Sequence, residues 1–457
     1  MYNLSEIAEY INGDLYGNDK IVSSFSIDSR TILQGDVFFC IRGERYDGHN
    51  FIKDSLKKAS CIVTAKDIED INLEEKSYIK VDDTLKALQD ASKYVRDKSS
   101  AKFIAITGSN GKTTVKEMIA HILSDYKTCY TQGNLNNHIG VPLTLLSMKQ
   151  NEDFVIIEIG SNNLGEIEPL AKIVNPDTAA VTNIGYAHIE GFKNLQNTAK
   201  EKYSLFKHLK KGGYAIINNQ DKFRKYLEKY NKIFFGEEKN LYNKVKKIFR
   251  NFTYKTKFLI IRKENKNIHE LKIKASSIKV KLSLNGDHNY YNAACATAIA
   301  LSLGIKLVDI KKKLESFKPI SSRLKLFKLD RDIQVIDDCY NANPNSFKAA
   351  ILFLSSLDQK KLVLMGDMVE LGKDTESFHS EIGRYAKTMG IDKFLSIGKN
   401  SKFASDVFGI NGYHFENAES LKSYLNNNIE PSSRILIKGS RSAKLEEYVE
   451  FLKTRRF

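Results

Sequence analysis

The chain has 457 residues, of which 42% are hydrophobic and 10% aromatic, and this composition predicts a folded protein of about two to four domains. The five cysteines are odd in number and far apart, which argues against a disulfide framework and against a Cys-x-x-Cys zinc site. No apolar run approaches the ~20 residues that a membrane-spanning helix needs, and the first residues do not form a secretory leader. We therefore expect a cytoplasmic protein with reduced thiols and no stable membrane association.

The formal net charge of +16 raises the question of nucleic-acid binding. Much of the excess is lysine scattered through residues 222 to 281, without an arginine-rich run or a helicase-type motif. A solvated surface or an anionic small substrate accounts for such a charge. We therefore expect no nucleic-acid partner, and a nucleic-acid-stimulated ATPase is the rival interpretation.

Residues 1 to 98 are expected to form a separate small α/β domain. Apolar residues at helical spacing from Leu4 to Ile11 predict a short amphipathic helix. The apolar run from Val37 to Ile41 predicts a strand, and the loops around it are rich in Asp, Arg, Gly and His. Loops on a rigid scaffold often carry binding groups, although a single arginine such as Arg30 is more commonly a surface charge.

A glycine-rich loop between a strand and a helix is the central motif of the chain. The apolar run from Phe103 to Ile106 predicts the strand, and apolar residues spaced as on one helix face follow from Val115 to Ile122. The loop itself is Thr107-Gly108-Ser109-Asn110-Gly111-Lys112-Thr113-Thr114. In such a loop, backbone N–H groups and a lysine bind phosphate and a threonine hydroxyl reaches Mg²⁺. The alternative is a glycine-rich βα turn without a ligand.

Two further strand ends carry residues that can bind a metal. The strand from Phe154 ends in Glu158, and a carboxylate inside an apolar strand is costly to bury without a partner. Because ligands bind at the carboxyl edge of a parallel sheet, we interpret Glu158 as a Mg²⁺ ligand. His188 follows the next strand, Ala179 to Gly185, and is either structural or a ligand. From composition alone, Lys200 and Lys202 are solvated surface.

Asparagines gather in two further places. The loop from Gln132 to Thr144 contains Asn134, Asn136 and Asn137, which serve either as turn residues or as amide contacts to a substrate. Asn289 and Asn292 share one face at the start of an alanine-rich helix that ends at Leu303. These two side chains suit hydrogen bonding to a base or simple helix capping.

From residue 319 onward, strands and helices alternate, which predicts another parallel α/β domain. The expected strands are Gln334–Asp338, Leu362–Met365, Phe394–Ile397 and Ile435–Lys438, and the expected helices lie near 346–357, 378–389, 418–427 and 443–453. Polar loops follow the strands at Asp337–Pro344, Gly366–Gly372 and Lys438–Ser442. These loops share one sheet edge, and we expect them to face the nucleotide of the preceding domain.

Together these loops resemble those of the Mur ligase family, the ATP-dependent amide-forming enzymes of peptidoglycan synthesis. The resemblance covers the whole chain and rests on residues 107–114, 133–143, 337–344, 366–372 and 438–442. It is strongest to the type that joins D-alanyl-D-alanine to a UDP-N-acetylmuramoyl-tripeptide through an acyl phosphate, with ATP and Mg²⁺. The Asn-rich loop and Tyr340–Pro344 argue against the tripeptide-forming ligases and the folylpolyglutamate synthases.

The resemblance implies an α/β fold of three domains. We expect a monomer, and the sequence itself does not determine the oligomeric state. Residues 1–98 are expected to bind the UDP group, residues 99–318 to form a P-loop-type ATPase with a parallel sheet, and residues 319–457 to form a Rossmann-like domain that closes over the site. The identity of the third residue of the acceptor tripeptide is not predicted.

The resemblance also implies roles for single residues. Lys112 and the loop from Thr107 to Thr114 hold ATP, and Thr113, Glu158 and His188 are metal ligands. Lys202 matches the lysine that is carbamylated in many members of the family, and Lys200 is the alternative position for that modification. The residues expected to act in catalysis are Lys112, His188 and Lys202. The expected contacts to the nucleotide are Asn289, Asn292, Arg323 and Asp338. The expected contacts to the substrates are Ser29, Arg30, Asn134, Asn137, Asn341 and Asn343. No role is assigned to His138.

Overall fold

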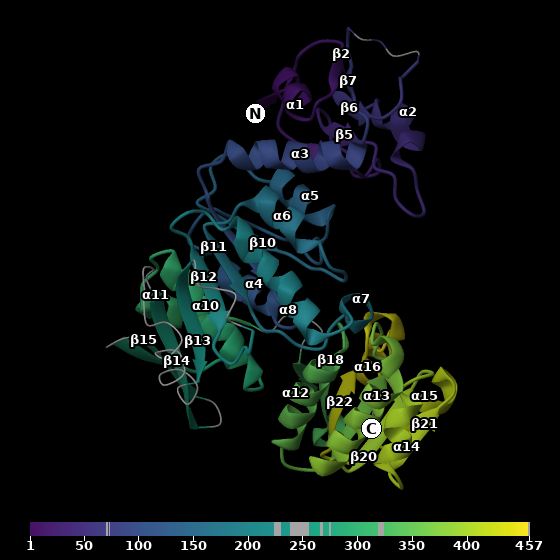
Figure 1. Cartoon of the computed structure of the whole chain (residues 1–457). Helices are drawn as coiled ribbons and strands as arrows, with labels where there is room; N and C mark the ends of the chain where they lie inside the picture. The colour runs from purple at the N-terminus through teal and green to yellow at the C-terminus, as the bar shows by residue number, and fades with distance from the viewer. Residues whose placement is uncertain are drawn as a thin grey trace.

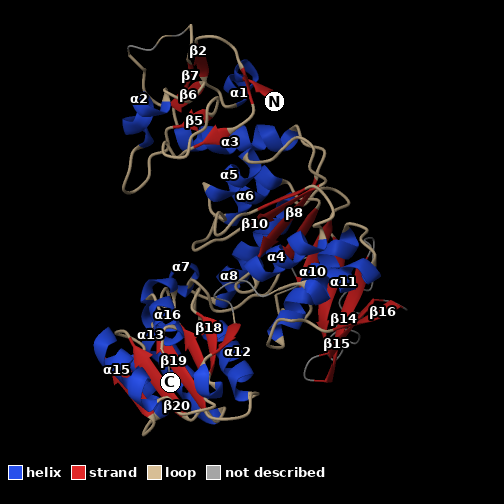
Figure 2. Ribbon diagram, turned by 180° about the vertical axis from the view of Figure 1, so that it is seen from behind, coloured by secondary structure: helices blue, strands red, loops and turns tan. Residues whose placement is uncertain are grey.

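The computed structural model describes residues 1–69, 72, 74–223, 230–237, 256–265, 268–273, 276–318 and 324–455. The described residues form three α/β parts that follow one another in space, with the N-terminal part at one end and the C-terminal part at the other (Figure 1). Figure 2 shows the strands of the central and C-terminal parts between layers of helices. The predicted fold class, α/β with a parallel central sheet and a Rossmann-like C-terminal part, is confirmed.

The N-terminal part is built on a five-stranded sheet in the order β2-β7-β6-β5-β4. Its strands are β2 (Asp14–Tyr16), β4 (Phe25–Ser26), β5 (Val37–Phe39), β6 (Cys61–Thr64) and β7 (Ser77–Lys80), and β1 (Tyr2–Asn3) pairs separately with β3 (Ile21–Val22). The helices are α1 (Leu4–Tyr10), α2 (Ile52–Ser55) and α3 (Thr84–Asp97). The helix predicted near Leu4 and the strand predicted at Val37 are confirmed. Helix α3 begins where the Asp83 side chain accepts hydrogen bonds from two backbone N–H groups.

A nine-stranded sheet forms the central part, in the order β16-β15-β14-β13-β12-β11-β8-β10-β9. The strands are β8 (Lys102–Thr107), β9 (Thr128–Tyr130), β10 (Phe154–Glu158), β11 (Thr178–Val181), β12 (Tyr214–Asn218), β13 (Asn231–Glu237), β14 (Thr256–Asn265), β15 (Ile268–Ile273) and β16 (Ser276–Val280). All neighbours pair in parallel except β14 with β15 and β15 with β16.

Helices cover both faces of the central sheet. They are α4 (Lys112–Ile122), α5 (Gly140–Leu146), α6 (Ile167–Val174), α7 (Ile189–Phe192), α8 (Leu195–Tyr203), α10 (His288–Ser302) and α11 (Leu307–Ser316). Alternate residues of β8 enter different cores: Ile104 and Ile106 pack with α4 and α10, and Phe103 and Ala105 with α5 and α6. A strand buried on both faces has a continuous apolar sequence, which is why this run was recognisable.

The C-terminal part has a six-stranded sheet in the order β17-β18-β22-β19-β20-β21. The strands are β17 (Lys325–Lys328), β18 (Gln334–Asp338), β19 (Lys361–Gly366), β20 (Lys393–Ile397), β21 (Gly412–Phe415) and β22 (Arg434–Lys438), parallel except for β17 with β18. The helices are α12 (Pro344–Ser355), α13 (Thr375–Thr388), α14 (Lys402–Phe408), α15 (Ala418–Asn428) and α16 (Glu446–Lys453). Every predicted strand and helix is present, while β17, β21 and α14 were not predicted.

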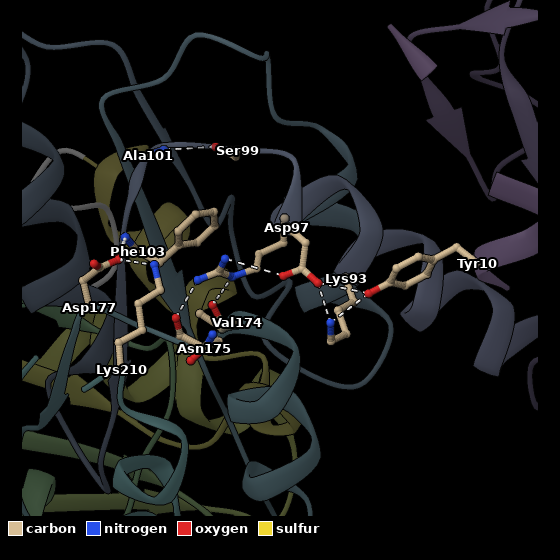
Figure 3. A network of polar contacts seen from close by, with 11 residues as sticks. Tyr10, Lys93, Asp97, Ser99, Ala101, Phe103, Val174, Asn175, Asp177 and Lys210 are labelled. Atoms are coloured by element: carbon tan, nitrogen blue, oxygen red, sulfur yellow. Dashed lines mark hydrogen bonds and ion pairs between the residues drawn. The ribbon is translucent and has the colours of Figure 1, made fainter. Parts of the chain in front are cut away.

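A buried arginine fastens the N-terminal part to the central part. The Arg96 guanidinium, on α3, donates to the carbonyl oxygens of Val174 and Asn175 at 2.7 Å each and lies 4.4 Å from the Phe103 ring centroid. These carbonyls belong to the C-terminal end of α6, which carries a partial negative charge. Figure 3 shows the network that continues from there through Asp97 and Lys93 to Tyr10.

Replacing Arg96 with alanine is expected to destabilise this junction by about 2–3 kcal/mol, because two charge-assisted hydrogen bonds and the ring contact are lost. Calorimetry should then show the first thermal transition about 4–9 °C lower than in the unmodified protein. The matched control is Lys86→Ala on the same helix, which removes only an exposed ion pair with Asp90 and should change the transition by about 1–2 °C at most. Equal shifts in the two variants would contradict the assigned role.

Candidate active site

A cavity of about 680 Å³ lies where the carboxyl edges of the central and C-terminal sheets face each other. From the central part, its lining includes residues 109–114, Glu158, His188 and the start of α10. From the C-terminal part, it includes residues 340–343 after β18, residues 369–371 after β19, and Lys438 at the end of β22. The strand-end loops predicted to face one another therefore do so.

The glycine-rich loop joins β8 to α4 as predicted, and its two glycines allow its shape. Gly108 and Gly111 have φ of +145° and +81°, the region that favours glycine. A Cβ on Gly108 would lie 2.0 Å from Thr182 Oγ1, and one on Gly111 would lie 2.3 Å from Asn292 Oδ1. Lys112 is the first residue of α4, and its Nζ donates to the Gly108 carbonyl oxygen at 2.8 Å. The N-terminus of α4 and this ammonium make the site suited to an anion.

Glu158 ends β10 and is 2% exposed. Asn136 Nδ2 donates to its Oε1 at 2.8 Å, and the Glu158 backbone N–H donates to Thr131 Oγ1 at 3.0 Å. Within the part of the chain that the structure describes, Oε2 is buried without a hydrogen-bond partner. Such an oxygen is costly to bury in a protein, and a divalent cation would satisfy it. The residues present therefore fit a cation here.

His188 Nδ1 and Glu370 Oε2 are in close contact at the cavity. The backbone N–H of Glu190 also donates to the Glu370 carbonyl oxygen at 3.1 Å. Contact with His188 lowers the pKa of the Glu370 carboxyl group, although the ring Nδ1 makes no hydrogen bond of acceptable geometry within the described residues. His188 was predicted as a candidate ligand, whereas Glu370 was recognised only as part of a polar loop.

Lys202, on α8, is buried beneath the cavity, so the expectation from composition that it is solvated surface was wrong. Its Nζ donates to Ser161 Oγ at 2.7 Å, and Ser161 lines the cavity. Burial, and then the charge of Lys112, hold the pKa of Lys202 well below its usual range. The rival Lys200 is exposed on the same helix. A buried amine with a lowered pKa is neutral more often and therefore more nucleophilic than a surface lysine.

The nucleotide-side candidates gather at the start of α10 and the end of β18. Asn289 Oδ1 accepts from Asn292 Nδ2 at 3.0 Å, and both residues line the cavity. Asp338 accepts from Lys438 Nζ at 2.6 Å. His288 lies beside them, and its burial lowers its pKa.

Residues from the C-terminal loops reach the phosphate loop directly. Asn343 caps α12 through Ser346 N–H, and its Nδ2 donates to Asn110 Oδ1 at 2.7 Å. Asn341 lines the cavity with Asn134, and its carbonyl oxygen accepts from Lys438 Nζ at 2.9 Å. Neither Asn289 nor Asn292 caps α10, whose N-cap residue makes no capping hydrogen bond through its side chain within the described residues. Asn343 instead caps α12 and also contacts Asn110 of the central part.

The remaining candidates do not line the cavity. Thr107 and Gly108 lie beneath it at the end of β8, and the Asn137 side chain accepts from the backbone N–H groups of Ile139 and Gly140. Ser29 and Arg30 lie in the N-terminal part, where Arg30 is exposed and paired with Asp28 at 2.7 Å. Arg323 lies outside the described residues, and the carbonyl oxygen of His138 accepts from Gln89 Nε2.

Several cavity residues were given no individual role from the sequence, namely His288, Tyr340, Asn345, Glu370 and Lys438, whereas Asn136 was recognised as a turn residue or a substrate contact. Over the described ranges, no three His, Cys, Asp or Glu side chains lie close enough together to form a metal cage. A cation here would therefore take part of its coordination from water or from a bound phosphate, as Mg²⁺ commonly does. In the same ranges, every helix is too short or too polar to cross a bilayer.

A glycine-rich loop that faces the strand-end loops of a second parallel α/β domain across one cavity is the arrangement of an enzyme that joins two substrates, and the family matches show that the class is an ATP-dependent ligase. Three family models match successive parts of the chain: "Mur ligase family, catalytic domain" at residues 22–105, "Mur ligase middle domain" at 106–300, and "Mur ligase, glutamate ligase domain" at 322–441. The chain belongs to the Mur ligase family.

Three relatives are similar to the chain over nearly their whole length. A UDP-N-acetylmuramoyl-tripeptide--D-alanyl-D-alanine ligase from Buchnera aphidicola is 37% identical, with 98% of this chain and 97% of the relative covered. MurF from Acinetobacter baumannii has a TM-score of 0.85 at 28% identity, with 99% of each chain covered. MurF ligase from Thermotoga maritima, solved in complex with ADP, has a TM-score of 0.82 over 94% and 97% of the two chains. At 24% identity that likeness bears on the fold alone.

Proposed function

We propose that this protein joins D-alanyl-D-alanine to a UDP-N-acetylmuramoyl-tripeptide, with conversion of ATP to ADP and phosphate, in the cytoplasmic synthesis of peptidoglycan precursors. The observation that carries the proposal is the cavity between the phosphate loop and the C-terminal loops, because it can hold a nucleotide and an acceptor together. The names of the relatives supply the two substrates. The enzyme is proposed to act as a monomer, without nucleic acid or membrane.

The cavity supports roles for the central and C-terminal domains, and the resemblance to the Mur ligases supplies the role of the N-terminal domain. We assign residues 1–98 to UDP binding, with Ser29 and Arg30 among the contacts, residues 99–318 to ATP binding, and residues 319–457 to closure over the reactants. The first boundary is supported by the short link between α3, which ends at Asp97, and β8, which begins at Lys102. The second falls between α11, which ends at Ser316, and β17, which begins at Lys325.

The reaction needs an activated carboxylate, because a free carboxylate would have to expel oxide when an amine attacks it. In the proposed path a carboxylate oxygen of the acceptor attacks the γ-phosphorus of ATP, the bond from that phosphorus to the β–γ bridging oxygen breaks, and ADP leaves. The free amine of D-alanyl-D-alanine then attacks the carbonyl carbon of the acyl phosphate, the nitrogen gives up one proton, and phosphate leaves with the electron pair of the C–O bond and takes up that proton. Lys112 and the N–H groups at the start of α4 stabilise the charge on the transferred group.

Mg²⁺ bound here would neutralise charge on the transferred phosphoryl group and align it for attack. Thr113, Glu158 and His188 are the proposed protein ligands, and the unpartnered Oε2 of buried Glu158 supports this assignment. Asn136 holds the other carboxylate oxygen and so orients Glu158. The contact between Asn343 and Asn110 covers the phosphate loop and helps to exclude water, which would otherwise hydrolyse an acyl phosphate.

Replacing Glu158 with glutamine is expected to raise the Mg²⁺ concentration for half-maximal activity by roughly 10–100-fold, the usual range for damage to a metal site. Glutamine keeps the size of the side chain and the hydrogen bond from Asn136, so the fold should be retained. The measurement is phosphate release as a function of Mg²⁺ at fixed ATP. The control Asp125→Asn removes an exposed carboxylate of the same domain and should leave the curve unchanged. An unchanged curve for Glu158→Gln would remove Glu158 from the proposed site.

The proposed function is tested by phosphate release from ATP and Mg²⁺ when UDP-N-acetylmuramoyl-tripeptide and D-alanyl-D-alanine are added singly and together. Release only with both present is the expected result. Release with a different amino acid or peptide would assign the chain to a sister ligase of the family. Stimulation by DNA alone would instead support the nucleic-acid-dependent ATPase that the net charge of +16 suggests.

A further inference from the structure

The contact between His188 and Glu370 links two loops that lie far apart in the sequence. His188 follows β11 of the central sheet, and Glu370 follows β19 of the C-terminal sheet. The pair is reinforced where the Glu190 N–H donates to the Glu370 carbonyl oxygen at 3.1 Å. The rings of Tyr186 and Phe378 make another contact between the same two regions, with centroids 5.4 Å apart. The Glu370 backbone and the loop around it are therefore held by several contacts between the domains, and the carboxylate itself contacts His188.

Both partners of this pair have left-handed backbones. His188 has φ of +52° and Glu370 has φ of +62°, which are costly values for residues with a Cβ. Strained conformations of this kind persist where the surrounding structure fixes them, and they cluster at ligand-binding sites. The exposed fractions of the two side chains are 23% and 42%, so the pair is too solvated to contribute much to stability. A role in positioning accounts for this costly geometry better than a stabilising role.

The carboxylate of Glu370 affects which ring nitrogen of His188 carries the proton. A neutral histidine carries its proton on one ring nitrogen and accepts or coordinates through the other. Glu370 Oε2 contacts Nδ1, although Nδ1 has no hydrogen-bond partner of acceptable geometry among the described residues. The negative charge of the carboxylate favours a proton on the nitrogen that faces it, which leaves the lone pair on Nε2. Histidines that bind metals are commonly oriented in this way by a carboxylate on the other nitrogen.

We propose that Glu370 is a positioning residue, which holds the ring of His188 through Nδ1 so that Nε2 is the nitrogen that binds the divalent cation. The inference rests on the proposed function, in which His188 is a cation ligand. Because Glu370 belongs to the C-terminal domain, docking of that domain also sets the orientation of a ligand in the central domain. Cation affinity and domain closure are then coupled through one side chain.

The first test measures binding of Mn²⁺ to the full-length protein in the presence of ADP. Free Mn²⁺ is quantified by electron paramagnetic resonance. Glu370→Ala should weaken Mn²⁺ binding roughly 10–100-fold, the range for removal of a carboxylate behind a metal ligand. Glu370→Gln should lose less, because its amide oxygen still accepts from Nδ1–H. The control Glu376→Gln removes an exposed carboxylate of the same domain and should bind Mn²⁺ like the unmodified protein.

The second test observes the ring itself, by nitrogen NMR of protein labelled with ¹⁵N in its histidine rings. The His188 signals are assigned by their loss in His188→Gln. The unmodified protein should show the proton on Nδ1, and Glu370→Ala should shift the population toward the tautomer protonated on Nε2. A merely structural ion pair would alter stability without moving this tautomer.

The outcomes separate the inference from the function on which it rests. If His188→Gln weakens Mn²⁺ binding but Glu370→Ala changes neither affinity nor tautomer, the inference alone is overturned. Tighter binding in Glu370→Ala would also overturn it, because the carboxylate would then compete with the cation for His188. If His188→Gln binds Mn²⁺ as tightly as the unmodified protein, the proposed role of His188 as a ligand fails, and the inference fails with it.

Discussion

Replacing Lys112 with alanine is expected to lower substrate-dependent phosphate release by about 10²–10³-fold, the cost of removing one preorganised group that stabilises transition-state charge. Lys112 is the first residue of α4, and its ammonium lies over the glycine loop, where it donates to the Gly108 carbonyl oxygen. It thus adds a full positive charge to the partial charge of the helix N-terminus. The loss should appear mainly in kcat, because the charge on the phosphoryl group grows during transfer.

The matched control for Lys112 is Lys127→Ala, which removes an exposed lysine of the same domain and the same unit of charge. Its activity should stay close to that of the unmodified protein. Lys112→Arg is expected to restore little activity, because the planar guanidinium does not fit where a compact ammonium lies against the loop. If Lys112→Ala retained most of its activity, the glycine-rich turn would not be a phosphate-binding loop.

Replacing Lys202 with methionine is expected to lower the ligase rate by about 100-fold, the upper end of the range for damage to the surroundings of a metal site. The buried Nζ of Lys202 contacts Ser161 at the cavity wall, and its lowered pKa favours the neutral amine that can react with CO₂. A carbamate at this position would be an anion beside the cation site, where an ammonium would repel the metal. Methionine fills the same space, so packing against Phe192 is retained.

The modification can be observed directly by carbon NMR of the protein in ¹³C-labelled bicarbonate. The unmodified protein should show one carbamate signal, and Lys202→Met should lose it. Lys200→Met serves as the control, because Lys200 is exposed on the same helix and should keep both the signal and the activity. Loss of the signal in Lys200→Met, with the signal kept in Lys202→Met, would assign the carbamate to the rival lysine.

The parts of the fold that were predictable from the sequence depend on local patterns. The strand, glycine loop and helix from Phe103 to Ile122 were recognised because burial on two faces makes β8 continuously apolar, and because Gly108 and Gly111 need positive φ. The alternating strands and helices after residue 319 were recognised because the inner strands of that sheet are also buried on both faces and therefore continuously apolar. The edge strands β17 and β21 were missed, since a strand with one exposed side has a weaker apolar pattern.

The parts of the site that were missed depend on contacts between distant segments. Asn136 was interpreted as a turn residue or an amide contact to a substrate, and nothing in its local sequence indicates that it donates to Glu158. Glu370 pairs with a histidine of another domain, which no spacing rule can show. Lys202 looked like surface because its helix is rich in polar residues, yet its side chain turns inward to Ser161. Polar residues reveal their partners only when the tertiary arrangement is known.

The most direct test of the central claim follows one oxygen atom. The acceptor is prepared with ¹⁸O in the carboxylate that is to be joined and is incubated with ATP, Mg²⁺ and D-alanyl-D-alanine, and the phosphate released is examined by mass spectrometry. Transfer through an acyl phosphate predicts one ¹⁸O atom in the phosphate for each amide bond formed, because the C–O bond breaks when the amine attacks. Unlabelled phosphate would mean that water, not the acceptor, receives the phosphoryl group, and would contradict the assignment as a ligase.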